Sequence, residues 1–147
     1  MSLSKKLTID YIPHLIRQSR CLMRVDFNVP MKDGVVTDPK RIVSTLPSIN
    51  YLLDNSAKSV ILMSHMGRPK GNRNTQYSLK PLVPVVEDLL QRKVTWVPDC
   101  VGSEAEKACA SSKDGEVLLL ENLRFHTAEE GKGVVNGEKV KANKNEI

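Results

Sequence analysis

Four short apolar runs recur along the chain, at residues 21–25, 59–63, 94–97 and 116–120. Each run is of strand length, and its apolar residues follow one another instead of alternating with polar ones. Consecutive apolar residues over so few positions are typical of strands that are covered on both faces of a parallel sheet. The pattern therefore predicts four strands, each buried on both faces.

A helical pattern lies between the first two runs. Apolar residues recur at helix spacing from 42 to 53, behind the sequence Thr37-Asp38-Pro39. Asp38 is a suitable N-cap, and Pro39 is favoured at the first helical position. The sequence predicts a helix that begins at Pro39.

Two more helical patterns separate the later runs. The stripe over residues 79–90 has Ser78 placed to cap it, and Pro84 falls inside it. Proline removes a helical hydrogen bond, so this helix should be kinked or should start later than the stripe. A shorter helix is predicted over residues 101–110.

The order of strands and helices predicts the fold class. Strands that alternate with helices form a parallel sheet with helices on both faces, a Rossmann-like α/β domain. Asp33-Gly34 predicts a tight hairpin turn. From Glu129 the chain turns polar and glycine-rich and shows no apolar stripe. We therefore expect residues 1–147 to form an incomplete domain, with the tail either disordered or leading into a longer chain.

Composition limits the class of protein. The chain has 147 residues, of which 40% are hydrophobic, so it fits one globular domain. No apolar run reaches the roughly 20 residues of a membrane span, and the charged N-terminus is unlike a signal peptide. These features favour a cytoplasmic protein. The three cysteines include no CxxC pair, which predicts free, buried thiols, and no histidine pair has metal-ligand spacing.

The net charge of +5 favours an acidic partner. Nucleic acid, a membrane surface and a phosphorylated metabolite all qualify. Nucleic-acid-binding proteins usually carry dense basic runs or clustered aromatic residues, whereas here the basic residues are dispersed and aromatics make up 4%. A small anionic ligand is the better hypothesis.

Polar side chains follow three of the predicted strands, where ligands bind in open parallel sheets. Guanidinium groups hold phosphate oxygens, an imidazole donates to them, and a glycine allows the backbone to approach closely. A carboxylate there would instead orient an arginine or accept from a ligand hydroxyl. These candidate site residues are Asp26, Asn28, Ser64, His65, Gly67, Arg68 and Arg124, with Arg41 at the start of the first helix.

Each candidate also has a purely structural interpretation. A single arginine after a strand is often solvated or ion-paired, Gly67 can be a turn residue, and Asp26 and Asn28 can cap a turn. Their convergence on one sheet edge favours a binding site. His14 and His126 lack such neighbours and are interpreted as structural. The motifs GxxxxGK[ST], GxGxxG and GxSxG are absent from the sequence.

Three longer motifs resemble the N-terminal half of phosphoglycerate kinases. They are RVDFNVP at residues 24–30, SHMGRPKG at residues 64–71 and LLENLRF at residues 119–125. Their order and spacing match the family, as does the Arg41-Ile42 pair. The resemblance runs from about Leu7 to the tail.

The resemblance implies a glycolytic and gluconeogenic enzyme that transfers a phosphoryl group between 1,3-bisphosphoglycerate and ADP, giving 3-phosphoglycerate and ATP with Mg²⁺. The family has two α/β domains joined by a hinge, one for the triose and one for the nucleotide. The resemblance implies a monomeric, cytoplasmic parent protein without nucleic-acid or membrane partners.

The resemblance also implies roles for the candidate residues. Asp26 and Asn28 would bind the glycerate portion, and Arg41 would stabilise the transferring phosphoryl group. The other phosphate would lie among Ser64, His65, Gly67, Arg68 and Arg124.

This chain departs from the family by ending at Ile147. The nucleotide-binding domain, with its contacts to ATP, ADP and Mg²⁺, would be missing. We therefore expect a truncated piece that is inactive alone and that self-associates through an open sheet edge. The alternatives are a non-catalytic module that binds anions or nucleic acid, and a structural remnant.

Overall fold

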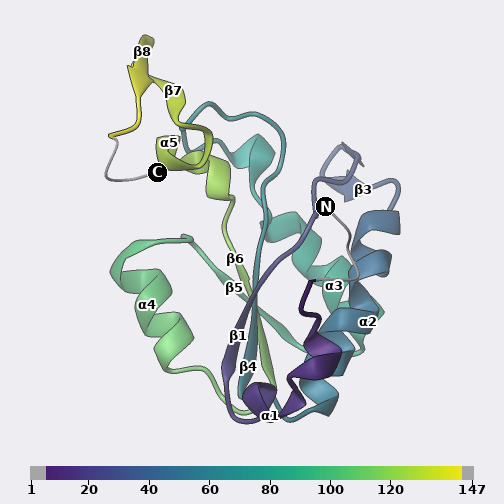
Figure 1. Ribbon diagram of the computed structural model, residues 1–147. Helices are drawn as coiled ribbons and strands as arrows, with labels where there is room; N and C mark the ends of the chain where they lie inside the picture. The colour runs from purple at the N-terminus through teal and green to yellow at the C-terminus, as the bar shows by residue number, and fades with distance from the viewer. Residues whose placement is uncertain (1–5, 144–147) are drawn as a thin grey trace.

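A four-stranded parallel sheet forms the centre of the protein (Figure 1). The computed structural model describes residues 6–143, so the chain end at Ile147 lies outside the described residues. The sheet order is β1-β4-β6-β5, and this α/β architecture confirms the predicted fold class. The strands are β1 (Arg20–Arg24), β4 (Ser59–Met63), β6 (Glu116–Leu120) and β5 (Val94–Val97).

Helices cover the two faces of the sheet unequally (Figure 1). On one face lie α2 (Lys40–Asp54) and α3 (Val83–Leu90), and α4 (Gly102–Ala110) lies on the other. Helix α2 begins one residue later than predicted, because Pro39 is its N-cap and Asp38 Oδ1 accepts from the Lys40 N–H at 3.0 Å. The proline in the second stripe delays the start of α3, as predicted, behind the 3₁₀ turn η4 (Lys80–Leu82).

Only the two central strands are buried on both faces. In β4, Val60 and Leu62 belong to the core under α2 and α3, while Ile61 belongs to the core under α4. The expectation was wrong for β1 and β5, which are the sheet edges. Leu22 in β1 is 60% exposed, and Thr95 in β5 is also exposed. A run of apolar residues shows that a segment is hydrophobic. Whether both faces of the strand are buried depends on its position in the sheet.

Two hairpins project from the sheet. The predicted turn at Asp33-Gly34 joins β2 (Met31–Lys32) to β3 (Val35–Val36). A second hairpin, β7 (Lys132–Val135) with β8 (Glu138–Lys141), was not predicted, because the tail lacks an apolar stripe. Its turn is Asn136-Gly137, and both residues have positive φ, 52° and 83°. That dipeptide is a strong hairpin signal even between polar strands.

The remaining elements are short. They are α1 (Pro13–Ile16), α5 (Thr127–Glu130) and the 3₁₀ turns η2 (Ile9–Tyr11), η3 (Thr75–Tyr77) and η5 (Leu123–Phe125). Within residues 6–143, no helix has both the length and the apolar character needed to cross a bilayer. The cysteines are free, as predicted, but half-buried instead of buried. Desolvation, followed by the charge of Asp99, raises the pKa of Cys100 to about 11.

Candidate functional site

The turn after β1 is built by two of the candidate residues. Asp26 Oδ1 accepts from the Asn28 N–H at 3.1 Å, which closes the turn. Asn28 Oδ1 in turn accepts from the Gly67 N–H at 3.0 Å. The side chain of Asn28 therefore links the segment after β1 to the loop after β4. The turn-capping interpretation of Asp26 is confirmed, and a ligand role for either residue stays a prediction.

Buried contacts hold the loop after β4 in place. Ser64 is fully buried, and its Oγ accepts from the Phe27 N–H at 3.0 Å. Gly67 has a φ of +59°, and a Cβ at this position would lie 2.4 Å from the ring of Tyr77. Glycine is required here both for the left-handed backbone and for the close packing of the ring. Ser64 is therefore a structural anchor of the loop and lies out of reach of solvent.

Arg124 is oriented by the same loop. Its Nη1 donates to the Gly67 carbonyl at 3.0 Å. Its backbone N–H donates to Asn122 Oδ1 at 3.0 Å, and Asn122 Nδ2 donates to the carbonyls of Met66 at 2.7 Å and Tyr77 at 2.8 Å. The fully buried Asn122 thus joins the end of β6 to the loop after β4. Asn122 was not among the predicted site residues, although it lies only two residues past the end of β6.

Arg41 reaches the site from the first turn of α2. Its Nη1 donates to the Asn28 carbonyl at 2.9 Å, and it forms an ion pair with Asp26 at 3.1 Å. About half of each side chain stays exposed, 53% for Arg41 and 58% for Asp26. The prediction that Asp26 orients an arginine is therefore confirmed, and the guanidinium of Arg41 stays half-exposed beside Asn28.

His65 lies among several charges at the same edge. Burial, followed by the positive charge of Arg124, lowers the pKa of His65 below its ordinary value. Asp26 acts in the opposite direction and Arg24 in the same direction as Arg124. A lowered pKa keeps the imidazole neutral near pH 7, where one ring nitrogen can still donate a hydrogen bond. Arg68, three residues further along the same loop, is exposed.

The carboxylates of α5 complete the charge pattern. Glu129 forms an ion pair with Arg24 at the end of β1, and Glu130 lies 3.5 Å from Arg124 Nε. The hydrogen bond from Arg24 lowers the pKa of Glu129 despite partial burial. Arg24, Glu129 and Glu130 were not among the candidate residues predicted from the sequence. Their meeting depends on how α5 folds back, and neither periodicity nor spacing reports that.

A separate cluster tests whether the chain could hold a divalent ion. Among residues 6–143, one group of three metal-ligand types lies close together, namely Asp99, Cys100 and His126. Asp99 already accepts from His126 at 2.7 Å and from Arg73 at 2.8 Å, and Mg²⁺ prefers oxygen ligands. This cluster does not fit Mg²⁺. The hydrogen bond to Asp99 confirms the structural interpretation of His126.

The structure therefore brings the candidate residues together at the carboxyl ends of β1, β4 and β6. Hydrogen bonds or ion pairs link Asp26, Asn28, Arg41, Gly67 and Arg124 into one network. His65 interacts electrostatically with Arg124 and Asp26. The arrangement places guanidinium groups and one imidazole around a common edge. Such a set of donors can hold a small ligand with phosphate or carboxylate groups.

Comparison with known proteins identifies the family. The family model described as "Phosphoglycerate kinase" matches residues 13–145. The chain belongs to the phosphoglycerate kinase family. It is 64% identical over 145 residues to a phosphoglycerate kinase of Sterkiella nova, and 61% identical over 145 residues to that of Euplotes crassus. Each alignment covers 99% of this chain but 35% of the relative.

Solved structures of the family share the fold. The crystal structure of phosphoglycerate kinase from Pyrococcus horikoshii OT3 matches with a TM-score of 0.75 at 32% identity. The match covers 84% of this chain and 29% of that one. The resemblance inferred from three motifs is confirmed. The chain spans about a third of the length of its phosphoglycerate kinase relatives.

Proposed function

We propose that this chain supplies the triose-binding part of a phosphoglycerate kinase. The parent enzyme would transfer a phosphoryl group reversibly between 1,3-bisphosphoglycerate and ADP, giving 3-phosphoglycerate and ATP in the cytoplasm. The observation that carries the proposal is the network at the sheet edge, in which Gly67 joins Asn28 and Arg124 across three strands. Family membership supplies the reaction, and the network supplies a site with the required charge.

The geometry refines the proposed roles. Asn28 uses its Oδ1 for Gly67, so we assign its Nδ2 amino group as the donor to the glycerate portion. His65, Arg68 and Arg124 hold the phosphate that does not react. Ser64 and Gly67 shape the loop and do not provide side-chain donors to the ligand. Asp26 accepts from a glycerate hydroxyl and keeps Arg41 in place.

Arg41 is the proposed catalytic residue. Phosphoryl transfer depends mainly on positioning and on stabilisation of charge, and a well-placed guanidinium contributes about 10³–10⁵ in rate in related chemistry. An arriving anion shares the Arg41 guanidinium with Asp26, which already fixes its orientation. ATP or ADP with Mg²⁺ supplies the second phosphoryl partner, and we assign their contacts to the part of the protein beyond this chain. The parent enzyme is proposed to act as a monomer.

Two assays test the proposal. The 147-residue chain should show a thermal shift with 3-phosphoglycerate but no turnover with ATP and 3-phosphoglycerate. In the longer parent protein, Arg41→Ala should lower kcat by about 10³-fold. His65→Gln should mainly raise KM, because His65 contacts the part of the substrate that does not react.

Two results would contradict the proposal. Turnover by the chain alone would show that it is catalytically complete. If His65→Gln strongly lowered kcat while Arg41→Ala changed only KM, the roles proposed for the two residues would be reversed. A thermal shift with generic polyanions but none with 3-phosphoglycerate would instead favour the alternative of a non-catalytic anion-binding module.

A further inference from the structure

Three side chains of different chemistry meet where the chain leaves β5. Asp99 and Cys100 follow the end of this strand, and His126 is the N-cap residue of α5, 27 positions after Asp99. A carboxylate oxygen, the thiol sulfur and a ring nitrogen of these residues all lie within 4.8 Å of one another, and all three residues are half-buried. Carboxylate, thiolate and imidazole are the three groups that bind zinc in proteins.

Hydrogen bonds orient the carboxylate of this cluster. Asp99 Oδ1 accepts from the Cys100 N–H at 2.7 Å and lies 2.7 Å from His126 Nε2. Arg73 donates to the other oxygen, Oδ2, at 2.8 Å and to the Pro98 carbonyl at 2.7 Å. Oδ1 is therefore the oxygen that faces the imidazole. Partners that hydrogen-bond a ligand from outside fix its orientation in metal sites.

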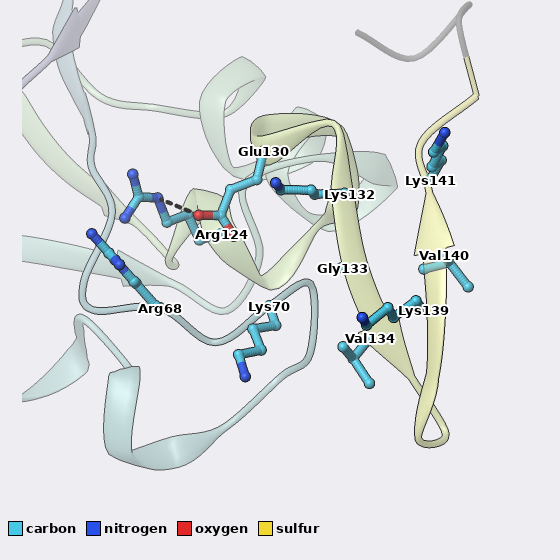
Figure 2. A pocket seen from close by; sticks show the side chains of 10 residues that line it. All are labelled: Arg68, Lys70, Arg124, Glu130, Lys132, Gly133, Val134, Lys139, Val140 and Lys141. Atoms are coloured by element: carbon cyan, nitrogen blue, oxygen red, sulfur yellow. Dashed lines mark ion pairs between the residues drawn. The ribbon is translucent and has the colours of Figure 1, made fainter.

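The cluster lies apart from the cavity of the candidate site. Figure 2 shows that cavity, of about 620 Å³, with Arg68 and Arg124 on one side and the β7–β8 hairpin on the other. None of the three cluster residues lines it. A ligand held by the cluster would therefore occupy a separate site, at the end of the edge strand β5.

We propose that Asp99, Cys100 and His126 bind one divalent ion of the zinc type. The ion is held by Asp99 Oδ1, Cys100 Sγ and His126 Nε2, with water in the fourth position, as in open zinc sites. Bonds of about 2.0–2.1 Å to oxygen and nitrogen place those two ligand atoms about 3.3 Å apart in a tetrahedron. The hydrogen-bonded pair, now at 2.7 Å, opens by roughly 0.6 Å to admit the ion.

The donor set selects the metal. One sulfur and one nitrogen suit zinc and its neighbours among the transition metals, whereas Mg²⁺ requires oxygen ligands. The positive charge of Arg73 opposes a bound cation, so the affinity should be lower than that of a closed zinc site with four protein ligands.

Binding releases one proton. The S–H bond of Cys100 breaks, the sulfur binds the ion as a thiolate, and the proton goes to solvent. The neutral imidazole of His126 keeps its single proton on Nδ1, which leaves the lone pair of Nε2 for the ion. Because the bound ion joins the end of β5 to the start of α5, it should stabilise the folded chain.

Co²⁺ is the spectroscopic probe, titrated into the untagged 147-residue chain. One equivalent should produce the near-ultraviolet charge-transfer band of a cobalt thiolate, and added Zn²⁺ should displace Co²⁺ and abolish the band. Zn²⁺ should raise the Tm, whereas Mg²⁺ at the same concentration should not. Cys100→Ser should remove the band, and both Cys100→Ser and His126→Gln should weaken Zn²⁺ binding by about 10- to 100-fold or more.

Cys109→Ser is the matched control. Cys109 is also half-buried and packs against the same core under α4 as Cys100, but it does not belong to the cluster. This variant should keep the cobalt band and the affinity for Zn²⁺. His126→Gln retains an N–H donor for Asp99, so it tests the metal ligand while preserving the hydrogen bond.

Three outcomes would overturn the proposal. The first is the absence of a cobalt thiolate band in the original chain. The second is a band that survives in Cys100→Ser or disappears equally in Cys109→Ser, because the sulfur ligand would then be another cysteine. The third is an unchanged Zn²⁺ affinity in His126→Gln. Failure of 3-phosphoglycerate to bind, with Co²⁺ binding intact, would contradict the proposed function alone.

Discussion

At the scale of single residues, Gly67 carries two separate constraints. Its φ of +59° disfavours any side chain, and a Cβ would lie 2.4 Å from the Tyr77 ring. We expect Gly67→Ala to lower the free energy of unfolding by about 2–4 kcal/mol, from left-handed strain together with overpacking. Urea denaturation followed by circular dichroism measures the loss.

Gly34→Ala is the matched control for that measurement. Gly34 has a φ of +77°, and nothing lies within 4 Å of a Cβ there. This variant should lose about 1–2 kcal/mol, the cost of the backbone alone. Equal losses at Gly34 and Gly67 would show that Tyr77 moves aside without cost.

His65 should report on anion binding through its titration. Because burial and Arg124 lower its pKa, the NMR midpoint of the imidazole should fall below the ordinary value of 6.5. A bound phosphate stabilises the imidazolium, so 3-phosphoglycerate should move the midpoint upward. The signal of the exposed His14 should not respond to the ligand. If 3-phosphoglycerate does not change the titration midpoint of His65, then His65 does not belong to the binding site.

The same shift affects folding stability. A lowered pKa in the folded protein means that the unfolded chain binds a proton more readily. Stability from His65 is therefore present above pH 6.5 and is lost as the pH falls through the lowered pKa. In His65→Gln, the free energy of unfolding, measured by urea denaturation at several pH values, should change less over this pH range.

Residue type and strand position were enough to predict which side chains meet at the sheet edge, but not which hydrogen bonds and ion pairs they form. Asp26 and Arg124 could be predicted because each follows the carboxyl end of a strand. The pairing of Arg124 with Glu130 could not, since it depends on a short helix folding back. Asn122 was not predicted, because its buried side chain orders the site by donating hydrogen bonds to backbone carbonyls. Those carbonyls belong to residues 45 and 56 positions away along the chain, so the sequence does not show that they are near.

At the scale of elements, the β7–β8 hairpin packs against the loop after β4 through a close approach at Gly133. Gly133→Ala would place a Cβ 2.4 Å from the Lys70 carbonyl oxygen and 2.8 Å from Thr127 Cγ2. We expect the hairpin to detach while the sheet stays folded. Hydrogen exchange should then lose protection at the Val134 amide, which donates to Lys70, and keep it in β4 and β6.

Gly137→Ala tests the turn of the same hairpin without touching the docking contact. Gly137 has a φ of +83° and open space around a Cβ. The turn should loosen, while the Val134 amide stays protected. Loss of protection at Val134 in both variants would show that the hairpin docks only when its turn is intact.

The elements were predictable where burial and periodicity coincide. The central strands β4 and β6 matched the expectation because helices cover both of their faces. The edge strands β1 and β5 did not, because an apolar run says nothing about its neighbours in the sheet. The β7–β8 hairpin was not predicted because its strands are polar, although the dipeptide Asn136-Gly137 is a recognisable hairpin turn signal.

At the scale of the whole molecule, the edge strand β1 leaves an apolar side chain uncovered. Leu22 pairs in register with Ile61, so it faces the side on which α4 lies, yet it is 60% exposed at the edge strand. An apolar edge strand favours association between copies. Leu22→Lys should shift the chain toward monomer in sedimentation velocity at high concentration.

Val35→Lys is the control for that shift. Val35 is 65% exposed, so its exposed fraction is similar to that of Leu22. It lies on the small β2–β3 hairpin and not on the edge strand of the sheet. This variant should leave the degree of association unchanged. An equal effect of both substitutions would mean that added charge, and not the sheet edge, controls association.

The strand order also determines where the molecule tolerates change. The candidate site residues follow β1, β4 and β6, which are neighbours in the sheet, whereas β5 lies outside them although it precedes β6 in the chain. The turn between α4 and β6, at residues 111–115, lies at the end of the sheet away from the site. Ser112 in this turn is buried and hydrogen-bonded to Ser59, whereas Lys113 is exposed. A fluorescent label at Lys113 would therefore lie in solvent, away from the ligand. The chain thus carries a natural attachment point for a reporter.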